Sequence, residues 1–182
     1  MNVKASVKQL EYLWHELRLI RGARVSRWIF MFLETPALVI MSYRIERSLC
    51  LLTGAAWPLF RLIIFPLILL LRIFGGRHEI SYRADIGKGL QVVHPCLGLV
   101  VHGSAVIGES CRLAGGNSIG AKRVIERGEL VLGDHVFLGI NACVLGPALI
   151  GDHVTIGAGA VVTDNLPGHC VAVGVPAKPL GS

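Results

Sequence analysis

Aliphatic residues recur at intervals of six along the second half of the sequence. A period of six matches neither one face of an α-helix nor the simple alternation of a strand. It predicts a solenoid of three short strands per coil, about eighteen residues per coil, in which every sixth side chain stacks in a narrow triangular core. Small or β-branched residues recur four places after the aliphatic ones. The aliphatic positions are Ile86, Val92, Val101, Ile107, Leu113, Ile119, Leu132, Leu138, Val144, Ile150, Ile156 and Val162.

The repeat is interrupted twice. The step from Val92 to Val101 is nine, so about three extra residues are expected to bulge around Pro95–Gly98. The step from Ile119 to Leu132 is thirteen, and the charged segment Ala121–Glu129 is predicted to leave the coil as a loop. Departures from a rigid repeat are where such folds place function.

The first half of the sequence is predicted to be helical. One helix is expected over residues 4–33, a second from Pro36 to about Leu52, and a third over Leu59–Phe74, where Gly75 and Gly76 end it. The chain is therefore divided into a helical segment, residues 1–76, and a β-solenoid domain, residues 77–180, which makes it mostly β.

The charge of the chain gathers in its apolar half. Residues 1–83 carry twelve Lys and Arg against five Asp and Glu (+7), whereas residues 84–182 carry six against seven (−1). The run 59–74 is shorter than the roughly 20 residues that span a bilayer. Arg61 and Arg72 are eleven apart and share a helix face, which favours a helix lying in the membrane interface. Burial between subunits and a true span are the alternatives.

Other compartments and partners are less well supported by the sequence. The basic charge comes with no nucleic-acid motif, so no nucleic-acid partner is expected. Five isolated cysteines, without a CxxC pair or a metal spacing, indicate reduced thiols in a cytoplasmic protein. His135 and His153 lie eighteen residues apart and are expected to stack on an outer corner rather than to bind a metal.

The sequence resembles the serine acetyltransferase family of hexapeptide-repeat acyltransferases, particularly its short, polysaccharide-associated branch. The matching stretches include EISYRADIGKGLQVVHPCLGLVVHGSAVIG (79–108), IGDHVTIGAGAVVTDNLPG (150–168) and the closing VAVGVPAKPL (171–180). The resemblance implies a left-handed parallel β-helix that forms a homotrimer, binds acetyl-CoA along its coils and requires no metal.

The resemblance also implies roles for particular residues. A catalytic histidine is expected at His94 and its acidic partner at Glu79. Small residues of late coils would contact acetyl-CoA, and a lysine would lie near its phosphates. By position these are Gly120, Gly139, Gly157, Ala158 and Lys178.

His94 suits this chemistry. Acetyl transfer to an alcohol needs a base that removes the hydroxyl proton, and a neutral imidazole, ordinarily of pKa about 6.5, serves at cytoplasmic pH. A carboxylate such as Glu79 would fix the tautomer of the imidazole. His102, close after the bulge, and Glu129, at the end of the loop, are candidates for contact with the acceptor.

The acceptor is expected to be a sugar hydroxyl of a cell-surface polysaccharide precursor, met at the cytosolic face of the inner membrane. Serine-specific members have an aspartate just before the catalytic histidine, where this chain has Val93, and an Arg-His pair where it has Gly128-Glu129. Serine O-acetylation is therefore the second hypothesis. A membrane-associated structural β-helix without catalysis is the third.

Overall fold

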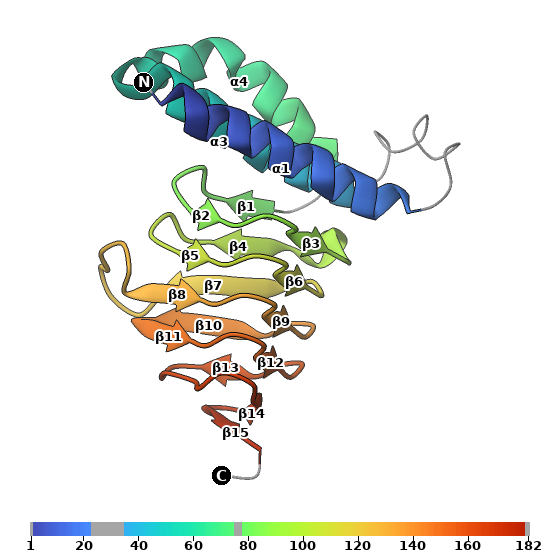
Figure 1. Ribbon diagram of the computed structural model, residues 1–182, viewed down its shortest axis with the longest axis vertical. Coiled ribbons are helices and arrows are strands. Elements are labelled where there is room, and N and C mark those ends of the chain that lie inside the picture. The colour runs from blue at the N-terminus through green and yellow to red at the C-terminus, as the bar shows by residue number, and fades with distance from the viewer. Residues whose placement is uncertain (1, 23–34, 75–77, 181–182) are drawn as a thin grey trace.

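The computed structural model describes residues 2–22, 35–74 and 78–180, and it consists of a helical cap on one end of a β-solenoid (Figure 1). Helix α3 packs between α1 and α4, and α3 also contacts the first coil of the solenoid. The second and third predicted helices are present, and Pro66 lies inside α4 without ending it. Residues 23–33 of the first predicted helix fall outside the described residues. The cap consists of α1 (Val3–Arg21), α3 (Thr35–Thr53), the 3₁₀ turn η2 (Gly54–Ala56) and α4 (Trp57–Phe74).

The solenoid is built from short strands that pair in parallel with the same strand of the next coil. We call the three faces sheet A (β1-β4-β7-β10-β13), sheet B (β2-β5-β8-β11) and sheet C (β3-β6-β9-β12-β14-β15). The strands are β1 (His78–Ile80), β2 (Asp85–Ile86), β3 (Gln91–Val92), β4 (Leu99–Val101), β5 (Val106–Ile107), β6 (Arg112–Leu113), β7 (Asn117–Ala121), β8 (Leu130–Leu132), β9 (Phe137–Leu138), β10 (Cys143–Gly146), β11 (Ala148–Ile150), β12 (Thr155–Ile156), β13 (Val161–Val162), β14 (Val171–Gly174) and β15 (Ala177–Pro179).

The aliphatic residues at intervals of six form the core, as predicted. All twelve are buried, and the most exposed of them, Val92, retains 5% of its accessible surface. The residues four places later are buried where the chain turns, for example Ala105, Cys111 and Ala142. Each coil is therefore covered by its neighbours, which is how a solenoid buries a continuous core.

Strand register confirms both interruptions. The offset from Glu79 in β1 to its partner Val100 in β4 is 21 residues, whereas the offset from Val100 to Ser118 in β7 is 18. The difference is the three residues of the bulge, which form the 3₁₀ turn η3 (Pro95–Leu97). The offset from Ser118 to Cys143 is 25, against 18 from Cys143 to Val161, so seven extra residues form the predicted loop.

A buried ion pair joins the cap to the solenoid. Arg44 of α3 and Glu16 of α1 have fully buried side chains, and Arg44 donates from Nε and Nη2 to the two carboxylate oxygens over 3.0 and 2.6 Å. Arg44 also donates to the carbonyl oxygens of Ile86 and Gly87. Glu16 accepts from the backbone of Gly89, so this pair connects two helices with the turn between β2 and β3.

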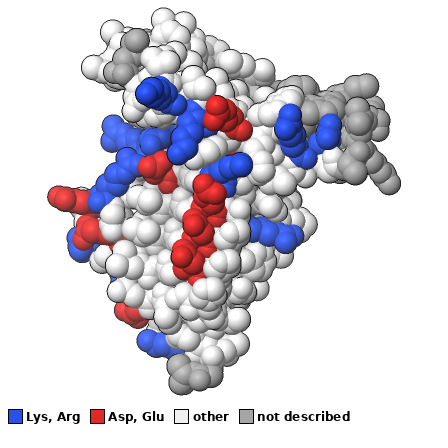
Figure 2. All heavy atoms as spheres, in the orientation of Figure 1, with Lys and Arg blue, Asp and Glu red and all other residues white. Residues whose placement is uncertain are grey.

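The corner between sheets B and C carries the predicted histidine stack. The rings of His135 and His153 lie 4.7 Å apart and nearly parallel, and His169 extends the stack at 4.8 Å. All three have φ between 57° and 59°, a left-handed conformation in which histidine is over-represented. Beside them, Asp134 accepts a hydrogen bond from the backbone of Glu109 one coil before it, and its own N–H donates to Asp152 one coil after it. Figure 2 shows acidic side chains in a column on one face of the molecule.

The last coil ends in a reversal of chain direction. β15 pairs antiparallel with β14, with Val173 opposite Lys178. Every other strand pair in the described solenoid is parallel. The helical cap covers the opposite end (Figure 1).

Candidate active site

His94 lies at the corner where the chain passes from sheet C to sheet A, which we call the C–A corner. Its backbone N–H donates to the carbonyl oxygen of Ala114 in the next coil over 3.1 Å, and its own carbonyl oxygen accepts from Leu97 in the 3₁₀ turn. The side chain itself is exposed. The next coil and the 3₁₀ turn therefore each hold the backbone of His94, while its side chain is exposed.

The next coil fits closely beneath His94. Gly115 adopts φ +130°, and a Cβ atom there would lie 2.5 Å from the carbonyl oxygen of His94. The backbone N–H of Gly115 donates to Oδ1 of Asn117, whose side chain is buried and donates from Nδ2 to the carbonyl oxygen of Gly139 over 2.7 Å. The support of His94 thus extends through two further coils.

A column of small residues continues down the C–A corner below His94. Strand register places Ala114, Gly139 and Gly157 in successive coils below Val93, the residue before His94. The register of His94 itself continues through Gly115, Ile140 and Ala158. A Cβ atom at Gly139 would lie 2.6 Å from the backbone nitrogen of Ala158, so this glycine is needed for the coils to stack. At about 4.8 Å per strand spacing, the column extends roughly 15 Å from His94.

The remaining predicted cofactor residues lie apart from this column. Gly120 is in β7 on sheet A, where an added Cβ would meet only ordinary contacts at 3.8 Å or more, so packing does not require a glycine. Lys178 lies in β15, 3.8 Å from Asp164, and both side chains are largely exposed. Lys178 is therefore an exposed cation beyond the coil that carries Gly157 and Ala158.

His102 and Glu129 lie near the other end of the strands of sheet A. This is the corner where the chain passes from sheet A to sheet B, which we call the A–B corner. Nδ1 of His102 accepts from the backbone of Ser104. Glu129 closes the loop: one carboxylate oxygen accepts from Arg123 over 2.7 Å and the other from the backbone N–H of Glu126 over 2.7 Å. The hydrogen bond from the N–H of Glu126 is the main cause that lowers the pKa of Glu129 below its ordinary value, and the hydrogen bond from Arg123 lowers it further.

The predicted residues thus form two groups on one chain. The 3₁₀ turn η3, Gly98 and β4 separate His94 from His102, so the two histidines lie at opposite ends of β4. Glu79 is exposed on β1 of sheet A, and in the described part of the chain it makes no hydrogen bond with His94. The structure brings His94 into contact with Gly115, places Gly139, Gly157 and Ala158 on the coils further along the same corner, and places His102 and Glu129 at the A–B corner.

Comparison with known proteins agrees with this architecture. Residues 130–164 match the family model described as bacterial transferase hexapeptide (six repeats). The putative colanic acid biosynthesis acetyltransferase WcaB of Escherichia coli K12 is 30% identical over 164 residues, which is 88% of this chain and 97% of that protein. The chain belongs to the hexapeptide-repeat acetyltransferases.

Serine acetyltransferases are relatives within this family. Serine acetyltransferase 1 of Arabidopsis thaliana is 38% identical over 105 residues, although the chain spans only 33% of its length and 41% of the enzyme from Synechococcus elongatus. The crystal structure of Neisseria gonorrhoeae serine acetyltransferase superposes with a TM-score of 0.75 at 25% identity, over 98% of this chain and 67% of that one. The left-handed β-helix fold is confirmed.

A metal is not evident in the part of this acetyltransferase that the structure describes. Residues 2–22, 35–74 and 78–180 contain no group of three or more His, Cys, Asp or Glu side chains that could hold an ion. The three stacked histidines lie on the outside of the B–C corner, away from the column below His94.

Two residues that support His94 were not singled out from the sequence. Asn117 lies four places after an aliphatic core residue, a position that in other repeats is mostly Ala, Cys or Val. A polar residue at this position was the signal in the sequence. Gly115 precedes it in a Gly-Gly pair. Their relation to His94 depends on the stacking of one coil on the next.

Proposed function

We propose that this chain transfers the acetyl group of acetyl-CoA to a hydroxyl of a sugar in a cell-surface polysaccharide precursor. The proposal rests on one observation above all: an exposed imidazole, that of His94, stands at the head of a small-residue column about 15 Å long. An extended thioester can lie along such a column with its reactive end beside His94. WcaB, whose name assigns it to colanic acid biosynthesis, aligns over nearly its whole length.

His94 would act as general base. It removes the acceptor's hydroxyl proton while the oxygen attacks the thioester carbonyl carbon, and it returns that proton to the departing sulfur as the C–S bond breaks. The products are an O-acetyl ester and the free thiol of coenzyme A. Glu79 is proposed to fix the tautomer of the imidazole, which would stabilise the imidazolium formed during transfer.

The site is proposed to be shared between subunits of a homotrimer. His94 lies at one end of the strands of sheet A, and the pair His102 and Glu129 lies at the other end. A single chain therefore does not place these residues around one substrate. The C–A corner of one copy facing the A–B corner of the next would bring the two groups together. His102 and Glu129 are then candidates for binding the acceptor.

Direct product analysis tests the proposal. The purified protein is incubated with acetyl-CoA and separate pools of amino acids, free sugars and lipid-linked sugars, and acetylated products are identified by mass spectrometry. His94→Asn is expected to lower turnover by about 10²–10⁴-fold. His153→Asn is the matched control, because it changes a histidine of the outer stack. Equal turnover in both variants would remove His94 from the mechanism.

Serine O-acetylation is the second candidate, supported by the relatives and solved structures that carry that name. Val93 weighs against it, since the serine-specific pattern has an aspartate at this position. Acetylserine as the main product would favour this candidate over the sugar. A catalytically inert β-helix, the third hypothesis, predicts no product and no stabilisation by acetyl-CoA.

A further inference from the structure

Helix α4 exposes a continuous hydrocarbon surface. Leu59, Leu62 and Ile63 retain 76%, 77% and 74% of their accessible surface, and the pattern continues along the helix to Ile73 and Phe74 at 65% and 64%. Only Trp57 and Ile68 of α4 are buried. Figure 2 shows uncharged atoms along the top of the molecule, where Figure 1 places α4.

Both arginines of α4 turn toward the protein. Nε of Arg61 lies 2.8 Å from one carboxylate oxygen of Glu46, and Nη2 of Arg72 lies 3.1 Å from the other. Glu46, on α3, is 1% exposed. Arg61 and Arg72 therefore share one helix face, as expected, and that face packs against α3. The buried carboxylate of Glu46 offsets one of the two positive charges of α4 and holds both arginines on the packed side, so the outward side of α4 carries no charged residue.

The exposed surface is too wide for one partner helix. At 3.6 residues per turn, the exposed positions of α4 cover an arc of about 220°. A helix contact covers an apolar stripe of roughly 100°. Helix α1 shows such a narrow stripe in Val3, Val7, Leu10 and Trp14, each 48–51% exposed and spaced by three or four residues. Lipid acyl chains can therefore cover the exposed surface of α4 more completely than one second protein helix can.

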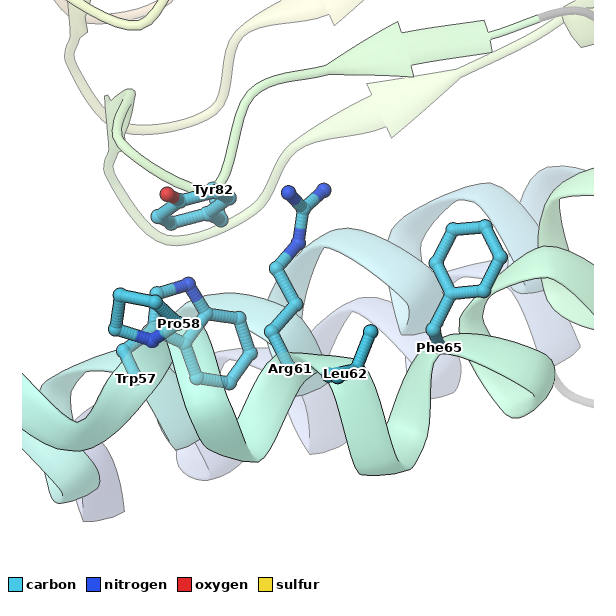
Figure 3. Close-up of a pocket in the computed structure, with 6 residues that line it drawn as sticks. All are labelled: Trp57, Pro58, Arg61, Leu62, Phe65 and Tyr82. Carbon is cyan, nitrogen blue, oxygen red and sulfur yellow. The ribbon is translucent and has the colours of Figure 1, made fainter.

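Both ends of α4 are held beside the first coil. Near its start, Trp57 meets Tyr82 edge to face at 5.5 Å, and Arg61 lies over the ring of Tyr82, around a pocket of about 240 Å³ (Figure 3). At its other end, Phe74 is only four residues before His78 in β1. Within the described residues, Thr35–Phe74 is long and apolar enough to cross a membrane by length and composition. Because both ends of α4 lie beside the solenoid, a bilayer in contact with α4 would run parallel to the helix axis, and α4 would not cross it.

We propose that α4 lies in one leaflet of an anionic lipid bilayer and that the β-solenoid projects from the membrane into the cytoplasm. Charge complementarity selects this occupant, because the described helices of the cap expose the cations Lys4, Lys8 and Arg18 against one exposed carboxylate, that of Glu11. Tyr82, which is partly exposed and packs on the buried Trp57, lies beside the start of α4, and amphipathic aromatic side chains favour the membrane–water interface. Glu46 makes the arrangement possible by keeping Arg61 and Arg72 out of the hydrocarbon.

Flotation with vesicles of equal parts phosphatidylcholine and phosphatidylglycerol tests the proposal on the full chain. The wild type is expected to float, and Leu62→Glu/Ile63→Glu is expected to lower partitioning at least about tenfold, because each charge opposes insertion. The matched control is Val175→Glu/Leu180→Glu, which alters two aliphatic residues of similar exposure, 71% and 62%, at the far end of the solenoid. It should float like the wild type, and circular dichroism verifies that both variants fold.

Three results would overturn the proposal. The wild type could remain at the bottom of the gradient, or the α4 variant could float as well as the control. The α4 variant could also lose an oligomer, measured by sedimentation without vesicles, while keeping its lipid partitioning, which would assign α4 to a subunit interface. Acetyl transfer to a soluble acceptor does not enter any of these readouts, so the proposed reaction can fail or hold separately.

A second variant tests the role of Glu46. Glu46→Gln leaves Arg61 and Arg72 without their shared counter-ion, so we expect both arginines to bind lipid phosphates instead. The ratio of binding to mixed vesicles over pure phosphatidylcholine vesicles is expected to rise several-fold. An unchanged ratio in a folded variant would show that neutralisation by Glu46 plays no part.

Discussion

The carbonyl oxygen of His94 lies 2.5 Å from the place that a Cβ atom would occupy on Gly115. A side chain at residue 115 must therefore push the His94 backbone outward, and the imidazole with it. A displacement of about 1 Å at a reacting group can reduce the rate 10²-fold. We expect Gly115→Ala to lower kcat by about that factor in the acetyl-transfer assay.

Gly22→Ala provides the control for that variant. Gly22 also has a positive φ, 63°, but an added Cβ meets nothing within 4 Å. Both variants should lose stability because alanine rarely adopts positive φ, whereas only Gly115→Ala should lose activity. A similar loss of activity in the two would indicate that the effect comes from general destabilisation.

Asn117 should be more important for stability than its size suggests. Asn117→Ala would leave the N–H of Gly115 and the carbonyl oxygen of Gly139 without their buried partner. Each such group costs about 1–3 kcal/mol. We expect urea denaturation to give a larger loss than for Val136→Ala, which removes only methyl groups at the equivalent repeat position. An equal or smaller loss would mean that water replaces the amide.

The Arg44–Glu16 pair should show strong coupling. Arg44→Met leaves a buried carboxylate uncompensated and is expected to reduce the free energy of unfolding by about 3–5 kcal/mol. Adding Glu16→Met should recover part of this loss, as a double-mutant cycle would measure. The exposed pair Lys178 and Asp164 serves as comparison and should show little coupling. Additive losses for Arg44 and Glu16 would argue against a directly coupled pair.

Cysteine labelling provides an independent check of the core. Burial raises the pKa of Cys111 to about 12, so its thiol stays protonated and inaccessible in the folded protein. Cys96, in the 3₁₀ turn after His94, is exposed. At pH 8 iodoacetamide should modify Cys96 readily and Cys111 only after unfolding, as peptide mass spectrometry would record. Equal labelling rates in the native protein would contradict the proposed core.

The solenoid was predictable because its core repeats locally. Each of the aliphatic residues reports the same environment, and the longer steps before Val101 and Leu132 give the size of both insertions. The position of His94 beside the first insertion was predictable from the same steps, whereas its role in catalysis stays a prediction. Nothing in a periodic pattern says how far its imidazole lies from Glu79, since that depends on side-chain geometry.

Long-range pairings were beyond the reach of the sequence. Helical spacing places Arg61 and Arg72 on one face but does not say which way that face turns, and the answer depends on Glu46 in another helix. Similarly, Glu16 and Arg44 lie 28 residues apart and meet only once both helices pack on the first coil. These contacts arise from tertiary packing, which the local periodicity of the sequence does not predict.

The antiparallel pairing of β15 with β14 has a consequence for assembly. A parallel solenoid presents unpaired backbone at each end, and such edges can template growth into fibres. Here the reversed strand β15 forms the last edge of sheet C, and the three helices cover the opposite end of the rod. A second copy could therefore not extend sheet C in the parallel register that runs through the coils before it.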